Sequence, residues 1–321
     1  MHLPKRLLTL SLAGLVLLSA APAALSSEPA RVRFAAPPWP GVTVKTALAS
    51  LLLETLGYEP RQQELSSNIT YKAMLQNDLD VFMAAWLPAQ QGMFEASFRE
   101  GEQRLMDLGN NVDGARLGFA VPAYVFDAGL HSAEDLDDPR FADRLDRTIY
   151  SIEIGSGMSD TLNAAVEKDT YGLGDWTLSE TSTPGMLSAV DHAMDQGEWI
   201  VFGAWTPHWM NIEYDIRYLE DPQDMWGPDG GHSDVRTLVT RAFAESHPNA
   251  TRLLDQLTFT AADQSIMIRG FSFEEQEPEA VALEWLRDHP ARVRAFLDGV
   301  TTRDGAPAWP VVQRILELPD D

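Results

Sequence analysis

The chain has 321 residues, which is enough for two domains of ordinary size or one large domain. Its 24 basic and 48 acidic side chains give a formal net charge of −24, so nucleic acid and anionic membrane surfaces are not expected as partners. The absence of cysteine excludes disulfides, thiolate catalysis and Cys-ligated zinc or iron–sulfur sites.

The first 27 residues have the pattern of a secretory signal peptide. Lys5 and Arg6 form a basic start, residues 7–18 are apolar, and the Ala-Pro-Ala at 21–23 supplies a small-residue cleavage site. The apolar run is shorter than the ~20 residues that a membrane-spanning helix needs. We therefore expect residues 1–27 to be removed and the mature protein, whose core is large enough to need no disulfides, to work in a bacterial periplasm.

Strand and helix patterns alternate along the mature chain. The apolar spacing predicts strands at 32–36, 81–86, 117–121, 149–152 and 200–205. It predicts helices at 42–56, where Gly57 ends the helix, at 70–76, at about 159–168, and over much of 249–318. Strands that alternate with helices indicate an α/β fold with a mostly parallel sheet.

Few residues form a pattern typical of catalysis or metal binding. No two of the seven histidines have the H-x-x-x-H or H-E-x-x-H spacing of a helical zinc site. The Gly-Ser-Gly at 155–157 lacks the spacing of a nucleophile turn, and the Gly-x-Gly at 172–174 lacks the third glycine of a dinucleotide loop. We therefore expect no enzymatic activity, no metal and no cofactor.

Four large aromatic residues stand where predicted strands end. Trp39 follows the first strand and precedes a helix, Trp86 and Trp205 each end a buried strand two residues before a proline, and Tyr124 follows the strand at 117–121. In open α/β sheets, ligands bind beyond the carboxyl ends of the strands. The four side chains could form a cage that attracts a cation, each contributing ~0.5–2 kcal/mol when desolvated. The alternative is that they fill the core.

Two short motifs surround two of these tryptophans, D-V-F-x-x-x-W-x-P at 80–88 and G-x-W-x-P-H at 203–208. Together with I-E-I-G at 152–155 and T-P-G-M-L at 183–187, they resemble the periplasmic substrate-binding proteins of ABC importers for quaternary amines, the glycine betaine/choline-binding family. The resemblance extends over roughly residues 31–270.

This resemblance implies a two-lobed, clam-shell fold with the ligand held between the lobes. Residues 31–116 and 213–321 would form the first lobe and residues 117–212 the second, so each lobe would supply two of the four cage residues. Such a protein captures a small quaternary amine and delivers it to a membrane permease and its ATPase, without catalysis. We expect it to act as a monomer.

The second end of the ligand is expected to lie against two helix N-termini. The resemblance implies an Asp and an Asn in choline-specific members of the family at the two positions where this chain has Gly41 and Ser156. Gly41 and Val42 begin one predicted helix, and Ser156 and Gly157 begin another, so free N–H groups and helix dipoles would favour an anion. Glycine betaine is therefore the favoured ligand, followed by carnitine or a related betaine.

Three alternatives stay open. If Gly41 only eases a turn and Ser156 only caps a helix, the ligand could be choline. The same fold could serve a sensor that signals to a receptor. An exported enzyme that processes a methylated amine would need an acid–base pair, for which Glu153 and Asp160 are the nearest candidates.

Overall fold

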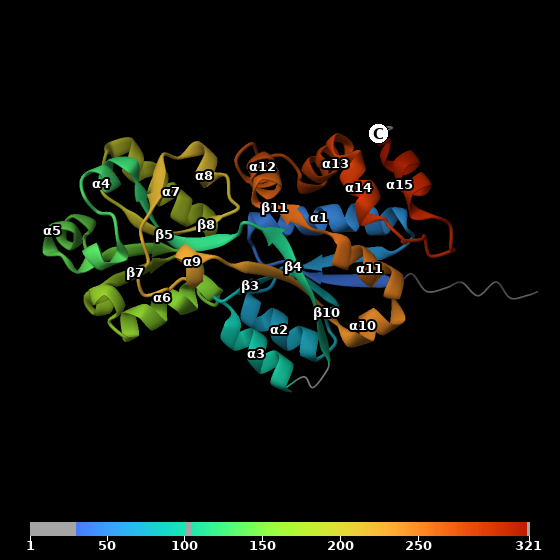
Figure 1. Cartoon of the computed structure of the whole chain (residues 1–321), viewed down its shortest axis with the longest axis horizontal. Coiled ribbons are helices and arrows are strands. Elements are labelled where there is room, and N and C mark those ends of the chain that lie inside the picture. Colours follow the sequence, from blue (N-terminus) through green and yellow to red (C-terminus); the bar gives the residue numbers. More distant parts are fainter. Residues whose placement is uncertain (1–29, 101–103, 320–321) are drawn as a thin grey trace, which may run out of the picture.

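The computed structural model describes residues 30–100 and 104–319, which form two lobes side by side, each built on its own β-sheet (Figure 1). The predicted signal peptide lies outside the described residues. Within them, no helix has the length and apolar character needed to cross a membrane.

The first lobe has a six-stranded sheet in the order β11-β4-β10-β3-β1-β2. Its strands are β1 (Arg31–Ala35), β2 (Glu59–Gln63), β3 (Val81–Leu87), β4 (Leu105–Asp113), β10 (Asp234–Thr240) and β11 (Phe259–Thr260). Its helices are α1 (Pro40–Thr55), α2 (Ser67–Leu75), α3 (Gln91–Glu100), α10 (Arg241–Ser246), α11 (Pro248–Gln256), α12 (Ala261–Ser272), α13 (Pro278–Asp288), α14 (Pro290–Phe296) and α15 (Ala308–Leu316). Figure 1 shows α1 and α12–α15 on one side of this sheet and α2 and α3 on the other.

The second lobe has a five-stranded sheet in the order β7-β6-β8-β5-β9. Its strands are β5 (Arg116–Pro122), β6 (Thr148–Ser151), β7 (Thr177–Glu180), β8 (Val201–Thr206) and β9 (Ile216–Tyr218). Its α-helices are α4 (Ala123–Asp127), α5 (Pro139–Ala142), α6 (Gly157–Glu167), α7 (Thr183–Gln196) and α8 (Met210–Glu213), and α9 (Pro228–Gly231) lies on the way back to the first lobe. Short 3-10 helices span Ala133–Asp137, Asp143–Leu145 and Thr170–Asp175.

Both sheets are mixed, which corrects the expectation of a mostly parallel sheet. β5 is the first strand after the chain enters the second lobe, and it runs antiparallel to β8 and β9. β10 is the first strand after the chain returns, and it runs antiparallel to β3 and β4. The remaining neighbours pair in parallel. The antiparallel strands are therefore the ones that the chain reaches by crossing between lobes.

Helix α1 is buried on nearly all sides. Pro40 at its first turn and Gly57, which follows the C-cap with φ of +90°, mark its ends as the sequence indicates. Between them, α1 packs against α12, α13 and α15 as well as against the sheet. Its buried positions include Val44, Leu48 and Leu52, but also the charged residue Lys45.

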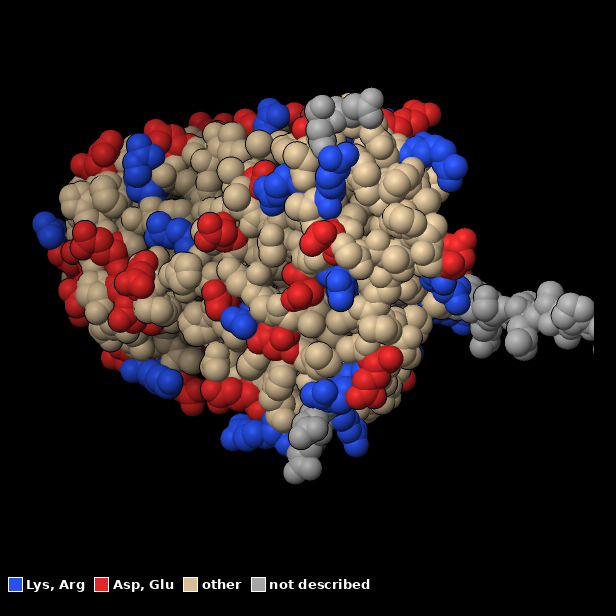
Figure 2. All heavy atoms as spheres, turned by 45° about the vertical axis from the view of Figure 1, so that its right-hand side comes forward, with Lys and Arg blue, Asp and Glu red and all other residues tan. Residues whose placement is uncertain are grey.

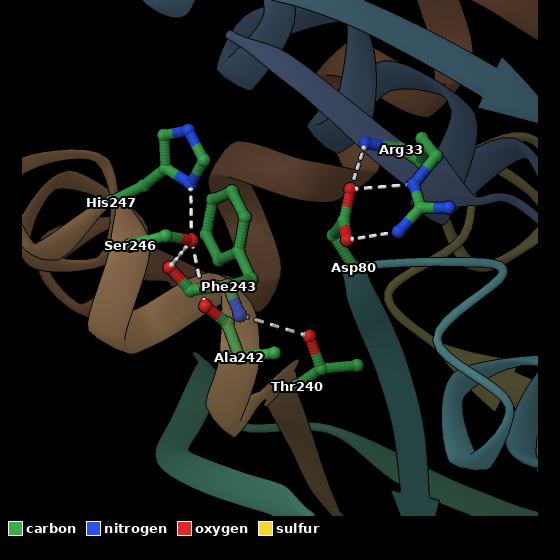
Figure 3. A network of polar contacts seen from close by, with 7 residues as sticks. All are labelled: Arg33, Asp80, Thr240, Ala242, Phe243, Ser246 and His247. Atoms are coloured by element: carbon green, nitrogen blue, oxygen red, sulfur yellow. Dashed lines mark hydrogen bonds and ion pairs between the residues drawn. The ribbon is translucent and has the colours of Figure 1, made fainter.

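An ion pair ties β1 to the start of β3. The Arg33 side chain donates from Nε and Nη2 to the two carboxylate oxygens of Asp80, at 2.9 and 2.7 Å, and the Arg33 backbone N–H donates to the same carboxylate (Figure 3). The Asp80 carbonyl in turn accepts from the backbone N–H of Thr240 at the end of β10. This contact therefore joins three neighbouring strands at one end of the first sheet.

Acidic and basic side chains are interspersed on the face shown in Figure 2. Basic groups commonly pair with acidic ones, as Arg236 does with both Asp107 and Asp234. Basic side chains that are paired in this way do not form a positive surface. Together with the excess of acidic side chains, this disfavours polyanionic partners.

The two crossings between the lobes lie next to each other. The first is the short step from Asp113 to Arg116, and the second runs from the end of β9 at Tyr218 to the start of β10 at Asp234. The expected boundary at residue 213 is therefore too early, because β9 still belongs to the second sheet. The Ser233 N–H donates to the carbonyl of Ala115, which links the two crossings.

Glycine is required at position 231, where the second crossing approaches the first. Gly231 has φ of +87°, and a Cβ there would lie 1.9 Å from the carbonyl oxygen of Leu117. Gly230 also has a positive φ, +71°, but a Cβ on it would meet no atom within 4 Å. An alanine at position 230 would therefore cause backbone strain alone, whereas an alanine at position 231 would cause both backbone strain and steric overlap.

We predict that Gly231→Ala lowers the free energy of unfolding by roughly 3 kcal/mol or more, since it adds overpacking to left-handed strain. Gly230→Ala should lower it by only about 1 kcal/mol, because the strain acts alone. Urea denaturation followed by circular dichroism measures both variants. Equal effects of the two substitutions would contradict the close approach.

Candidate functional site

A pocket lies where the two lobes meet, and residues of both lobes line it. The first lobe contributes Trp39, Gly41, Val42, Lys45, Ala84, Trp86, Ala89, Gln90 and Gln264. The second lobe contributes Leu117, Ile152, Ser156, Gly157, Met158, Trp205 and Pro207. Neither lobe alone encloses this space.

Three of the four aromatic residues singled out in the sequence lie together in this pocket. Trp39 is the N-cap residue of α1, Trp86 lies in β3, and Trp205 lies in β8. Trp39 and Trp205 are buried and Trp86 is half-buried. The Trp39 indole N–H donates to the Glu153 carboxylate of the other lobe at 2.5 Å, which fixes its ring. The result is a pocket with three indole rings and an otherwise largely apolar wall.

The structure does not bring Tyr124 into the pocket. Tyr124 lies in the short helix α4, is 37% exposed, and donates its hydroxyl to the backbone carbonyl of Glu198. The helix begins at Ala123, directly after the strand, and turns the ring toward Glu198. Leu117, at the start of β5, lines the pocket from the second lobe instead.

Two helix N-termini, one from each lobe, open onto the pocket. Gly41 and Val42 occupy the first turn of α1, which no side chain caps, and both line the pocket. Gly157 begins α6, and the hydroxyl of Ser156 caps this helix by accepting from the Ser159 N–H at 3.1 Å. The Ser156 hydroxyl thus has the capping role that the sequence left open, and its hydrogen stays available as a donor.

The lobes contact each other at two places. Trp39 of the first lobe bonds Glu153 of the second. The Trp209 indole N–H donates to the Ser272 hydroxyl at 2.9 Å, and Arg269 of α12 pairs with Glu213 of α8. The structure therefore has its lobes closed around the pocket.

Gly157 of the second lobe lies close to the backbone of the first lobe at the pocket. A Cβ at this position would lie 2.9 Å from the backbone carbon and oxygen of Ala89. Ala89 belongs to the turn after β3 in the first lobe, so any larger residue at 157 would hold the lobes apart.

The two acid–base candidates do not form a catalytic pair. Burial raises the pKa of Glu153, but its carboxylate accepts from Trp39, and Asp160 is exposed on α6. Among the described residues, the side chains that line the pocket include no carboxylate. In residues 30–100 and 104–319, no group of three or more His, Asp or Glu side chains is placed to hold a metal ion.

Lys45 lines the pocket and is only 2% exposed. Its ammonium donates to the Met83 carbonyl at 2.8 Å and to Asn111 Oδ1 at 2.6 Å, both of which are neutral. Burial without a carboxylate partner lowers the pKa of Lys45 to about 7. Sequence reasoning missed this residue, although a lysine on the apolar face of a predicted helix is an available signal.

Gln264 of α12 was also missed in the sequence. It is 1% exposed, lines the pocket, and its Nε2 has no hydrogen-bond partner within the described part of the chain. Its Oε1 lies 3.6 Å from where a Cβ on Gly41 would stand. No local pattern could have placed it here, because it is more than 200 positions away from Gly41 in the sequence.

Together, the fold and the site define a two-lobed ligand-binding protein whose pocket is completed by both lobes. Residues 30–288 match the family described as the substrate-binding domain of ABC-type glycine betaine transport systems, OpuAC, and the chain belongs to this family. The family resemblance, the fold class and the functional class expected from the sequence are thereby confirmed. Members of this family are extracytoplasmic and work with a membrane permease.

Three known proteins show how close the similarity is. The chain is similar to an ABC-transporter choline-binding protein in complex with choline, with a TM-score of 0.84 and 32% identity over 89% of this chain and 98% of the other. It is similar to lactococcal OpuAC in its closed-liganded conformation with glycine betaine, with a TM-score of 0.73 and 25% identity over 83% of this chain and 99% of the other. The glycine betaine/carnitine transport binding protein GbuC of Listeria monocytogenes is 30% identical over 163 residues, which are 51% of this chain and 53% of that protein. These proteins differ in the ligands their names give, so the choice of substrate must be argued from the pocket.

We predict that Gly157→Ala weakens ligand binding by about tenfold or more, because the added methyl group overlaps the Ala89 backbone and opposes closure. The thermal stability of the ligand-free protein should change little, since each lobe keeps its own core. Calorimetric titration and thermal melting measure the two effects. Unchanged affinity would show that the lobes close without this contact.

We predict that Lys45→Met changes how stability depends on pH in the ligand-free protein. The folded pKa of about 7 lies below the ordinary value of 10.5, so between these pH values only the unfolded wild-type chain binds the proton. Wild-type stability should therefore rise with pH relative to the variant, by up to about 1.4 kcal/mol per pH unit between pH 7 and 10.5, and the difference should be constant below pH 7. Urea denaturation of both proteins from below pH 7 to pH 10.5 measures the free energy of unfolding. If this free energy changed with pH in the same way in both proteins, the prediction would be wrong.

Proposed function

We propose that this protein captures a quaternary ammonium compound that also carries a carboxylate, with glycine betaine as the first choice and carnitine or a related betaine next. It delivers this ligand to the permease of an ABC importer. The observation that carries the proposal is the meeting of Trp39, Trp86 and Trp205 from two lobes in one closed pocket. Membership of a glycine betaine transport family supports it.

The three tryptophans suit the trimethylammonium end of such a ligand. A quaternary ammonium ion cannot donate hydrogen bonds, so a protein recognises it best through aromatic faces and exclusion of water. Because Trp39 and Trp86 belong to one lobe and Trp205 to the other, the cage is complete only when the lobes close. Ligand binding then favours the closed form, which a permease can distinguish from the open one.

The helix N-termini in the pocket suit the anionic end of such a ligand. The first turns of α1 and α6 both line the pocket, and helix N-termini favour negative charge. The described pocket lining supplies no carboxylate that would balance a ligand with a lone positive charge. A zwitterion brings its own carboxylate and matches both ends.

Choline is the second candidate ligand. The similarity to a choline-binding protein, at 32% identity over nearly all of that protein, favours it. The Ser156 hydroxyl could bond the choline hydroxyl, but Gly41 leaves the choline cation without the counter-charge that the family resemblance associates with choline specificity.

The remaining parts of the proposal concern where and how the protein acts. We place the mature protein in the periplasm after removal of residues 1–27, as a monomer without catalytic activity. A sensor that signals to a receptor would use the same pocket. A gene for a permease and an ATPase beside this one would favour transport.

We predict that Trp39→Ala, Trp86→Ala and Trp205→Ala each weaken binding of glycine betaine by about tenfold or more, because each removes cation–π attraction and opens the cage to water. Trp309→Ala, in α15 of the first lobe and outside the pocket, is the matched control and should keep the wild-type affinity. Calorimetric titration of the wild type with glycine betaine, carnitine and choline comes first. Wild-type affinity in all three pocket variants would refute the cage.

A further inference from the structure

The buried cation of Lys45 lacks a negative partner in this structure. Its two hydrogen-bond acceptors, the Met83 carbonyl and Asn111 Oδ1, are neutral, and no third acceptor occurs among the described residues. Asn111 is held in this orientation because its Nδ2 donates to the Met83 carbonyl and to the Thr237 hydroxyl. The ammonium is therefore fixed in place with one donor position unused.

An unpaired buried charge destabilises a folded protein. Transfer of a charged group out of water costs several kcal/mol unless a counter-ion and hydrogen bonds replace the lost hydration. Methionine or leucine would fill the same space in α1 without this cost, and the neighbouring positions of the helix are indeed apolar. A ligand that brings a carboxylate into the pocket would supply the negative charge that the described lining lacks.

Lys45 lies in the same helix as Gly41, and both residues line the pocket. It follows Gly41 by four residues in α1, so the two lie on the same face of the helix, one turn apart. Gln264 lies beside Gly41 and presents an unpartnered, buried Nε2. The uncapped first turn of α1 adds backbone donors at the same place. The lining of this one pocket therefore includes three groups with unused donors, namely the Lys45 ammonium, the Gln264 Nε2 and the first turn of α1.

We propose that the Lys45 ammonium, together with Gln264, binds the carboxylate of the ligand and so determines that this pocket selects zwitterionic over purely cationic quaternary amines. This inference rests on the proposed function, since it needs the tryptophan cage to hold the other end of the same ligand. Lys45 acts in two ways. It attracts the carboxylate of a betaine, and it repels the net positive charge of choline.

The test is calorimetric titration of wild type and Lys45→Met with glycine betaine and with choline. The variant should lose affinity for glycine betaine by at least about tenfold, as expected when one partner of a buried charge pair is removed. Its affinity for choline should be equal to the wild-type value or higher. Lys72→Met, which removes an exposed positive charge on α2, controls for net charge and should leave both affinities unchanged.

A second variant tests the same idea without removing the lysine. Gly41→Asp places a carboxylate one turn before Lys45, where it can pair with the ammonium and repel the ligand carboxylate. We expect it to weaken binding of glycine betaine and to strengthen binding of choline. Gly41→Ala separates the effect of the added Cβ, which would make ordinary contact with Ile268 and Gln264, from that of the charge.

The outcomes separate this inference from the proposed function. Wild-type affinity for glycine betaine in Lys45→Met, or an equal loss for glycine betaine and choline, would overturn the role of Lys45 and leave the cage intact. A wild-type protein that binds choline more tightly than glycine betaine would also overturn it. A wild-type protein that binds no quaternary amine would refute the proposed function itself.

Discussion

The approach of Gly157 to the backbone of Ala89 decides how tightly the two lobes can enclose the pocket. Every other feature of the site depends on that enclosure. The indole of Trp39 reaches Glu153 across the interface, and Trp205 comes within the same pocket as Trp86 only because the lobes meet. In an open cleft, water would compete with the aromatic rings for a cation and with the helix N-termini for an anion.

In the proposed function, the tryptophans hold the cationic end of the ligand and Lys45 with the helix N-termini holds its anionic end. Neither set of groups would bind strongly in a water-filled cleft. The tryptophans offer only weak attraction to a hydrated cation, and the buried lysine is unfavourable unless an anion approaches it. In a site without water, the tryptophans attract a ligand cation and the lysine attracts a ligand anion. Under the proposed function, the same features would explain why the protein closes on its ligand and why that ligand is a zwitterion. The lobe interface also contains the bonds of Trp209 with Ser272 and of Arg269 with Glu213.

Local sequence patterns were enough to predict α1 and the strands that end at Trp86 and Trp205, because periodic apolar residues and nearby prolines or glycines determine these elements. They failed for β4 and β10, whose pairing joins segments more than a hundred residues apart and whose composition is mixed. Tyr124 shows the limit for side chains: its position after a strand resembles that of the tryptophans, yet α4 starts at once and turns it away. Lys45 is visible in the sequence, but its contacts with Met83 of β3 and Asn111 of β4 depend on how segments distant in the sequence pack against α1.

The buried lysine also has a consequence for the protein without ligand. Lys45 lines the pocket, and in the closed, empty pocket its ammonium has only two neutral acceptors. A ligand carboxylate would offset this cost and would favour the loaded closed state over the empty closed state. A transporter that recognises closed carriers would then rarely encounter an unloaded one, and few cycles of ATP hydrolysis would be spent without cargo.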